Sequence, residues 1–333
     1  MGPIFTTADI AHIRKKIPKF EFDSVINSEW CAGAPVQAYL HFYQIDFTQR
    51  YPGLQYHMGY VDCAGFRTAL QVWQPQEARG TLVLIHGYYD HVGIYGKAIA
   101  YGLAQGLAVV AFDLPGHGLS SGERIAIDNF DQYADVLAGV LSVVRSDSNL
   151  PQPFFGLGQS TGGSVWLNYL WRYQAPVATA SLSDKYIARI VLCAPLVLPR
   201  GWKLGRYLYW LVKPFIKRMP RGPSLSSHDL AFNDFVDYQD PLQSHYLSVR
   251  WVGAMKAWNE QFCGFTPRDE ELLFIQGTAD LTVDWQYNLP LIQAKLPALR
   301  VEMIEGSGHQ LVNESEAYRS AVFSKVTQFL FNE

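Results

Sequence analysis

The sequence predicts an α/β protein with a mostly parallel central sheet, helices on both faces and a helical insertion. Short apolar runs, such as residues 82–85 and 108–112, alternate with longer segments that have helical periodicity. Strands of a parallel sheet are buried on both faces, so continuous apolar runs are typical of them. With 49% hydrophobic and 14% aromatic residues, the chain of 333 residues can bury the large core that such a fold needs.

Residues 1–53 precede this alternation and are expected to form an N-terminal extension. A short helix is predicted within it, with Thr7 or Asp9 as its cap and Lys16 near its end. Pro18 stops this helix, because proline has no backbone N–H and its ring clashes with the preceding turn.

The alternating elements begin at residue 54 with two strands joined through a hairpin turn at residues 62–65. We predict strands at residues 54–61, 66–74, 82–85, 108–112, 154–157, 186–193, 272–276 and 299–304, and helices at 94–105, 128–144, 160–173 and 316–331. Segments 54–195 and 268–333 are therefore expected to build the α/β core. Residues 196–267 interrupt the alternation for roughly 70 residues, which is too long for a loop in a compact domain, so we expect a cap inserted over the sheet.

A candidate nucleophile lies between a predicted strand and a predicted helix. Residues 158–162 have the sequence Gly-Gln-Ser-Thr-Gly and match the pattern G-x-S-x-G, in which the serine occupies a strained turn at the carboxyl edge of the sheet. A turn that only caps the helix is the alternative, but Gly162 and Gly163 would then cost the first helical turn about 1 kcal/mol each. We therefore predict that Ser160 is a nucleophile.

A serine nucleophile needs a base, and the base needs an acid that orients it. Of nine histidines, only His309 lies in a loop after the last predicted strand, between small residues that leave room for its ring. Asp280 follows the strand at 272–276 and precedes His309, so the chain order is Ser, Asp, His. Asp284 is the alternative acid, but it precedes a helical segment and is expected to cap it.

The negative oxygen of a tetrahedral intermediate needs two N–H donors, which together form an oxyanion hole. The backbone N–H of Thr161, directly after Ser160, is the first candidate. The second is expected from the loop at residues 86–91, where we select the backbone N–H of Tyr88. A tight turn around Gly87 also accounts for this loop, and the two interpretations can hold together.

Five motifs in this order resemble the monoacylglycerol lipase and lysophospholipase branch of the α/β hydrolases. They are His86-Gly87 with His91 and Tyr95, the run of residues 113–124, the pentapeptide around Ser160, residues 277–280, and Gly308-His309. The resemblance extends from about residue 55 to 331 and implies the α/β-hydrolase fold, hydrolysis of fatty-acyl monoesters and no cofactor. Gln159 and Thr161 stand where the branch commonly has His and Met, and Asp90 stands where Glu is usual. These differences leave the candidate triad unchanged but bear on acyl-chain preference.

Residues 196–222 carry seven basic side chains and no acidic one: Arg200, Lys203, Arg206, Lys213, Lys217, Arg218 and Arg221. Apolar side chains repeat on another helical face at Leu204, Leu208, Leu211, Phe215 and Met219. Pro214 must kink or divide such a helix. A basic amphipathic segment predicts contact with an anionic membrane surface. A solvated lid, whose apolar face packs over the active site, is the alternative.

The remaining composition limits the partners that can be expected. The net charge of −3 predicts no nucleic-acid partner, and the four cysteines lack metal-ligand spacing, so no metal site is predicted. The sequence has neither a signal-peptide pattern nor a long apolar run, so we expect a cytoplasmic protein, with or without peripheral membrane contact. An amide-cleaving or acyl-transferring enzyme with the same triad and a non-catalytic binding module are the alternative functions. The sequence predicts no oligomeric state.

Overall fold

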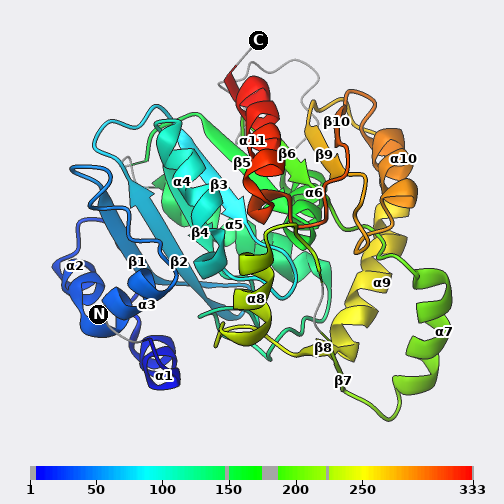
Figure 1. Ribbon diagram of the computed structural model, residues 1–333, viewed down its shortest axis with the longest axis horizontal. Helices are drawn as coiled ribbons and strands as arrows, with labels where there is room; N and C mark the ends of the chain where they lie inside the picture. Colours follow the sequence, from blue (N-terminus) through cyan, green and yellow to red (C-terminus); the bar gives the residue numbers. More distant parts are fainter. Residues whose placement is uncertain (1–4, 147–149, 175–186, 223–224, 332–333) are drawn as a thin grey trace.

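The structure is a computed structural model that describes residues 5–146, 150–174, 187–222 and 225–331. A sheet of eight strands runs through its centre in the order β1–β2–β4–β3–β5–β6–β9–β10 (Figure 1). Strand β2 runs antiparallel to its neighbours β1 and β4, whereas the remaining neighbouring pairs in this sheet are parallel. The prediction of an α/β fold with a mostly parallel sheet is confirmed.

All eight strands lie within a few residues of the positions predicted from the apolar runs. They are β1 (Gln55–Cys63), β2 (Phe66–Gln74), β3 (Thr81–Ile85), β4 (Ala108–Phe112), β5 (Phe154–Gln159), β6 (Arg189–Cys193), β9 (Leu273–Gly277) and β10 (Arg300–Ile304). The predicted start of the sixth strand, Tyr186, lies outside the described residues. The hairpin turn is confined to Ala64 and Gly65, whose positive φ angles of 50° and 81° suit a two-residue connection between twisted strands.

Helices cover both faces of the sheet (Figure 1). They are α4 (Gly96–Ala104), α5 (Phe130–Ser146), α6 (Thr161–Tyr173), α10 (Trp285–Lys295) and α11 (Glu316–Phe331). Ile99 of α4 and Val326 of α11 belong to the apolar cluster on one face, whereas Val140 of α5 and Leu167 of α6 belong to the cluster on the other. Each helix therefore buries one apolar stripe against the strands, as its periodicity predicts.

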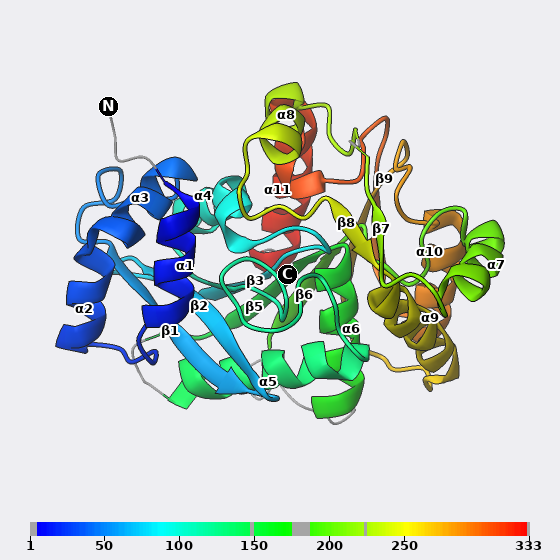
Figure 2. The same ribbon diagram turned by 90° about the horizontal axis from the view of Figure 1, so that it is seen from below.

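The N-terminal extension is packed into the core of the protein. It forms α1 (Thr7–Lys16), α2 (Val25–Ala32) and α3 (Ala34–Phe42), which lie beside β1 and β2 (Figure 2). Val36, Tyr39 and Ile45 are fully buried and belong to the same apolar cluster as α4 and α11. The predicted cap of α1 was wrong: Thr6 is the cap, and its side chain and that of Asp9 each accept the other's backbone N–H.

In the inserted segment, residues 196–222 and 225–267 as described form three helices and a two-stranded antiparallel sheet between β6 and β9. These elements are α7 (Trp202–Val212), β7 (Arg218–Pro220), α8 (Leu230–Tyr238), β8 (Tyr246–Ser248) and α9 (Val249–Gly264). Helix α7 ends before Pro214, so the basic segment is divided there as expected. Figures 1 and 2 both show α7 at the edge of the molecule, away from the central sheet.

A buried carboxylate connects this inserted segment to the N-terminal extension. Asp240, just after α8, accepts a hydrogen bond from the Tyr43 hydroxyl at 2.7 Å and lies 2.8 Å from Nε2 of His91. Tyr43 follows α3, and His91 follows the loop after β3. Burial works against the charged form of Asp240, but His91, Tyr43 and the Leu242 N–H outweigh it and hold the pKa of Asp240 below its ordinary value. Three distant segments thus meet at one ionised group.

Val36→Ala is expected to lower the free energy of unfolding by about 2 kcal/mol, because it removes two buried carbon atoms and leaves a cavity. Val36 is 0% exposed in α3, whereas Val25, at the start of α2, is 70% exposed. Val25→Ala is therefore the matched control and should change the free energy by about 0.5 kcal/mol or less. Denaturant unfolding measures both values. Equal, small effects would contradict the placement of the extension in the core.

Candidate active site

Ser160 occupies a strained turn between β5 and α6. Its φ and ψ angles are 55° and −114°, a conformation that costs a non-glycine residue of order 1–3 kcal/mol. The turn needs glycine on both sides: a Cβ on Gly158 would lie 2.4 Å from the carbonyl carbon of Gly162, and one on Gly162 would lie 2.1 Å from the carbonyl oxygen of Ile85. The close approach of strand and helix therefore places Ser160 at the carboxyl edge of the sheet.

His309 and Asp280 meet beside this turn. Asp280 follows β9 and His309 follows β10, so both come from the carboxyl ends of neighbouring parallel strands. Nδ1 of His309 lies 2.7 Å from Oδ2 of Asp280, and both side chains are buried. Asp284 lies elsewhere and caps α10 by accepting the Tyr287 N–H. The structure thus brings together the acid and the base that the sequence analysis selected.

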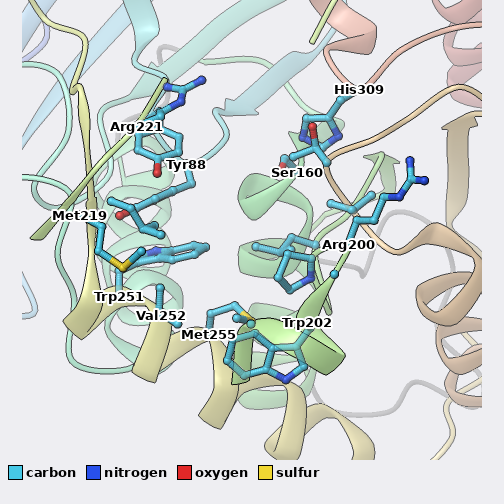
Figure 3. Close-up of a pocket in the computed structure, with 18 of the residues that line it drawn as sticks. Tyr88, Ser160, Arg200, Trp202, Met219, Arg221, Trp251, Val252, Met255 and His309 are labelled. Carbon is cyan, nitrogen blue, oxygen red and sulfur yellow. The ribbon is translucent and has the colours of Figure 1, made fainter. Parts of the chain in front are cut away.

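Ser160 and His309 line a cavity of about 360 Å³, in which Figure 3 shows them side by side. The rest of its wall is largely apolar, with contributions from α7, β7, β8 and α9. Trp251, Val252 and Met255 of α9 and Trp202 of α7 lie at the end of the cavity opposite Ser160 (Figure 3). An extended apolar chain attached to a group at Ser160 therefore fits this wall.

Of the two candidate oxyanion donors, Tyr88 lines this cavity and Thr161 directly follows Ser160 at the start of α6. Among the described residues, the backbone N–H groups of Tyr88 and Thr161 donate to no protein acceptor. The loop that carries Tyr88 touches Ser160, since a Cβ on Gly87 would lie 3.3 Å from Cβ of Ser160. The Tyr88 hydroxyl donates to the carbonyl of Ile125, and its ring stacks on Trp251 at 3.7 Å. Side-chain packing therefore fixes the loop and leaves its N–H available.

Several groups that hold these loops in place escaped the sequence analysis. The Gln159 amide donates to the carbonyl of His309 at 2.8 Å, and the Gln310 amide donates to both oxygens of Asp90 at 3.0 and 3.1 Å. The Glu314 carboxylate accepts the backbone N–H of Gly308 at 2.7 Å. Gln159, Gln310 and Glu314 lie close in sequence to Ser160 or His309, which is the only sequence signal that could have drawn attention to them.

Charges around His309 set its protonation. Burial of the imidazole opposes its charged form, but the nearby Asp280 carboxylate, its hydrogen bond and the charge of Asp90 outweigh burial and raise the pKa of His309 above 6.5. Burial likewise opposes ionisation of Asp280, but His309 and the donors Gln276 and Thr282 hold the pKa of this carboxyl below 3.8. The pair therefore stabilises the imidazolium that forms when His309 accepts a proton. Among the described residues, no cluster of His, Cys, Asp or Glu could hold a metal ion.

Comparison with known proteins identifies the family. A family model described as serine aminopeptidase, S33, matches residues 76–316. The chain belongs to this family. The predicted α/β-hydrolase fold and the resemblance to the monoacylglycerol lipase-like branch are confirmed.

Individual relatives fall in the same branch. The chain is 26% identical to human monoglyceride lipase over 81% of its own length and 88% of that protein. It is 31% identical to the monoacylglycerol lipase of Mycolicibacterium smegmatis over 44% of its own length, and spans about half of that protein, 52%. The fold matches a soluble variant of monoglyceride lipase from Saccharomyces cerevisiae with a TM-score of 0.67, at 19% identity over 83% of this chain and 95% of that one.

The imidazole of His309 is expected to titrate above pH 6.5, because the Asp280 and Asp90 charges favour its protonated form. NMR titration of the ring measures this pKa directly. Asp280→Asn removes the closest negative charge, so the pKa should fall. Asp284→Asn, which removes a carboxylate that caps α10, is the control and should leave it unchanged. An unchanged pKa in Asp280→Asn would show that the pair does not set the protonation of His309.

Proposed function

We propose that this protein is a serine ester hydrolase that cleaves fatty-acyl monoesters with the triad Ser160, His309 and Asp280. The observation that carries the proposal is the arrangement of the three groups at one apolar cavity. Ser160 stands on a strained turn beside His309, and His309 is hydrogen bonded to buried Asp280. No cofactor is needed for this chemistry, because each proton transfer can pass through the imidazole.

The reaction has two steps. His309 accepts the Ser160 proton as Oγ attacks the ester carbonyl, and the N–H groups of Tyr88 and Thr161 stabilise the resulting oxyanion. The intermediate then releases the alcohol, which takes the proton from His309, and leaves the acyl group on Ser160. A water molecule next gives a proton to His309 and attacks the acyl-enzyme. The fatty acid leaves, and the proton returns to Ser160.

The substrate class is supported by the cavity and by the names of the relatives. The relatives that align with most of this chain include the human and rat monoglyceride lipases. The wall formed by α7 and α9 is rich in Trp, Met, Leu and Val side chains, which suit an acyl chain. Amide cleavage is the second candidate, because the family description is that of an aminopeptidase. Its free amine would need an available carboxylate, but Asp90 in the cavity wall already accepts hydrogen bonds from Tyr95 and Gln310.

Ser160→Ala, His309→Ala and Asp280→Asn should each lower kcat by on the order of 10⁴-fold, because the three groups act as a unit. Double variants should be little worse than single ones. Turnover of a p-nitrophenyl ester, a monoacylglycerol and an aminoacyl anilide measures activity and separates esters from amides. Asp284→Asn is the control. Full activity of Asp280→Asn together with a loss in Asp284→Asn would move the acid to Asp284.

We also propose that helix α7 and the residues after it touch anionic membranes. Helix α7 has no buried side chain. Gly205, Leu208, Tyr209 and Val212 line the cavity. Leu204 is 79% exposed, and other apolar side chains outside the cavity wall are also exposed: Tyr207, Trp210, Leu211, Phe215 and Ile216. A solvated lid would be expected to cover these side chains, so their exposure favours an interfacial segment.

Five basic residues of this segment are exposed outside the cavity wall, and two line the cavity. Those outside the cavity wall are Lys203, Arg206, Lys213, Lys217 and Arg218, and the cavity-lining ones are Arg200 and Arg221. Among the described residues, Arg218 is the one of the seven that forms an ion pair, with Glu123. The Lys213 ammonium lies 5.1 Å from the ring of exposed Trp210 and 5.6 Å from the ring of Tyr209, which lines the cavity. Among the described residues, none of the helices combines the length and apolar character needed to cross a bilayer. The proposed contact is therefore peripheral.

The protein should bind anionic vesicles more tightly than neutral ones, and added salt should weaken the binding. Each Lys near an anionic surface contributes about 1 kcal/mol, so Lys213→Glu with Lys217→Glu should abolish binding while hydrolysis of a short, water-soluble ester continues. Lys15→Glu with Lys16→Glu in α1 makes the same charge change on a distant helix and should leave binding intact. Vesicle co-flotation measures both. Equal binding to neutral and anionic vesicles, or to neither, would contradict the proposal.

A further inference from the structure

The cavity wall contains a charged side chain, Arg221, that the proposed triad does not use. Arg221 follows β7 and lines the cavity that contains Ser160. Figure 3 shows Arg221 beyond Tyr88 on the wall across from Ser160 and His309, in the half of the cavity opposite Met255 and Trp202. An ester bound with its carbonyl at Ser160 and its acyl chain at the apolar end would therefore direct its alcohol portion toward the half that contains Arg221.

The guanidinium of Arg221 is held in place but has no acidic partner. Its backbone N–H donates to the carbonyl of His245 at 2.8 Å, and its guanidinium stacks on the ring of Tyr89 at 4.0 Å. Among the described residues, no carboxylate lies within ion-pair distance of Arg221. By contrast, Arg218, three residues earlier in β7, pairs with Glu123. A guanidinium stacked on an aromatic ring keeps its N–H edge free, and this edge matches the oxygens of a phosphate.

A second, polar cavity adjoins Arg221. It has a volume of about 220 Å³ and is also lined by Asp237, Tyr238, Gln243 and His245 from the inserted segment. Arg221 belongs to the walls of both cavities. Asp237 lies on the wall of the polar cavity without pairing with Arg221, so the cavity presents separate positive and negative groups. A headgroup that carries a phosphate followed by an ammonium group has the complementary charges.

The other guanidinium at the active-site cavity has a less suitable environment. Arg200 lines the active-site cavity, but it also borders a cavity of about 340 Å³ whose wall includes the carboxylates Asp280 and Asp284. The pKa of Asp280 lies below its ordinary value, so this group is ionised and would repel a phosphate. The Arg221 side of the cavity is therefore the better place for an anionic headgroup.

We propose that Arg221 and the adjoining polar cavity form a headgroup subsite for zwitterionic lysophospholipids, with the phosphate on Arg221 and the ammonium group toward Asp237. The proposal rests on the proposed ester hydrolysis at Ser160 and names its substrate class. It assigns Arg221 the role of a specificity-determining residue. An uncharged glycerol headgroup would leave both charged groups of the subsite without a partner.

The test compares two substrates with the same oleoyl chain in neutral detergent micelles, lysophosphatidylethanolamine and monooleoylglycerol. Lysophosphatidylethanolamine has no net charge, so attraction of the protein to a charged surface does not affect the comparison. Wild type should have the higher kcat/KM on lysophosphatidylethanolamine. Arg221→Gln should lower the ratio of the two kcat/KM values by about ten- to hundredfold, because hydrogen bonds to a charged group are lost. Asp237→Asn should lower the same ratio to a smaller extent.

Arg218→Gln removes the same charge from β7, just before Arg221, and should leave the ratio at the wild-type value. A wild-type preference for monooleoylglycerol, or an unchanged ratio in Arg221→Gln, would overturn the headgroup subsite while the esterase proposal stands. A fall of the ratio in Arg200→Gln alone would overturn it as well, because the headgroup would then lie on the other wall. Absence of wild-type activity on both lipids and on a p-nitrophenyl ester would instead refute the proposed function itself.

Discussion

The close backbone contact between β3, β5 and α6 is the constraint on which the candidate site depends. Without side chains at Gly158 and Gly162, the helix begins within van der Waals reach of both strands, and Ser160 is forced to positive φ. The same contact brings the loop after β3 against Ser160, where Gly87 leaves room for it. A larger residue at Gly162 would displace α6, and with it the candidate nucleophile Ser160 and the Thr161 N–H together. The strain at one residue is thus maintained by the packing of three elements.

Buried carboxylates fix the loops that surround the turn at Ser160. Asp280 orients His309, Glu314 holds the backbone of Gly308, and Asp90 accepts the Gln310 amide, so the loops after β3, β9 and β10 are tied together by charged acceptors. Such groups are costly to bury and stabilise a structure only when all their hydrogen bonds are made. Each buried carboxylate is therefore compatible with one arrangement of its loop. This restriction keeps His309 and Asp280 at hydrogen-bonding distance.

The outer side of the inserted segment is exposed rather than buried. The inner side of α7 and the helix α9 provide the apolar wall of the cavity, whereas the outer side of α7 exposes aromatic and aliphatic side chains next to unpaired basic ones. In the proposed function this wall would face an acyl chain on one side and an anionic surface on the other. Arg221 lies where the apolar wall meets a polar cavity, and in the proposed subsite this contrast would separate the two ends of the substrate.

The sequence by itself determined the succession of strands and helices along the chain. It also determined the three candidate triad residues, because apolar runs and strand-end motifs are local properties. Ser160, Asp280 and His309 each follow a strand closely, and a parallel sheet brings such positions to one edge. Only the tertiary structure decided the role of Glu314, whose donor at His228 is 86 residues away, and the burial of Val36 in the extension. The tertiary structure also decided which side of α7 faces the cavity. The sequence pattern of an amphipathic helix does not depend on whether its apolar side contacts protein, solvent or lipid. Only the packing of the helix against other elements determines that environment.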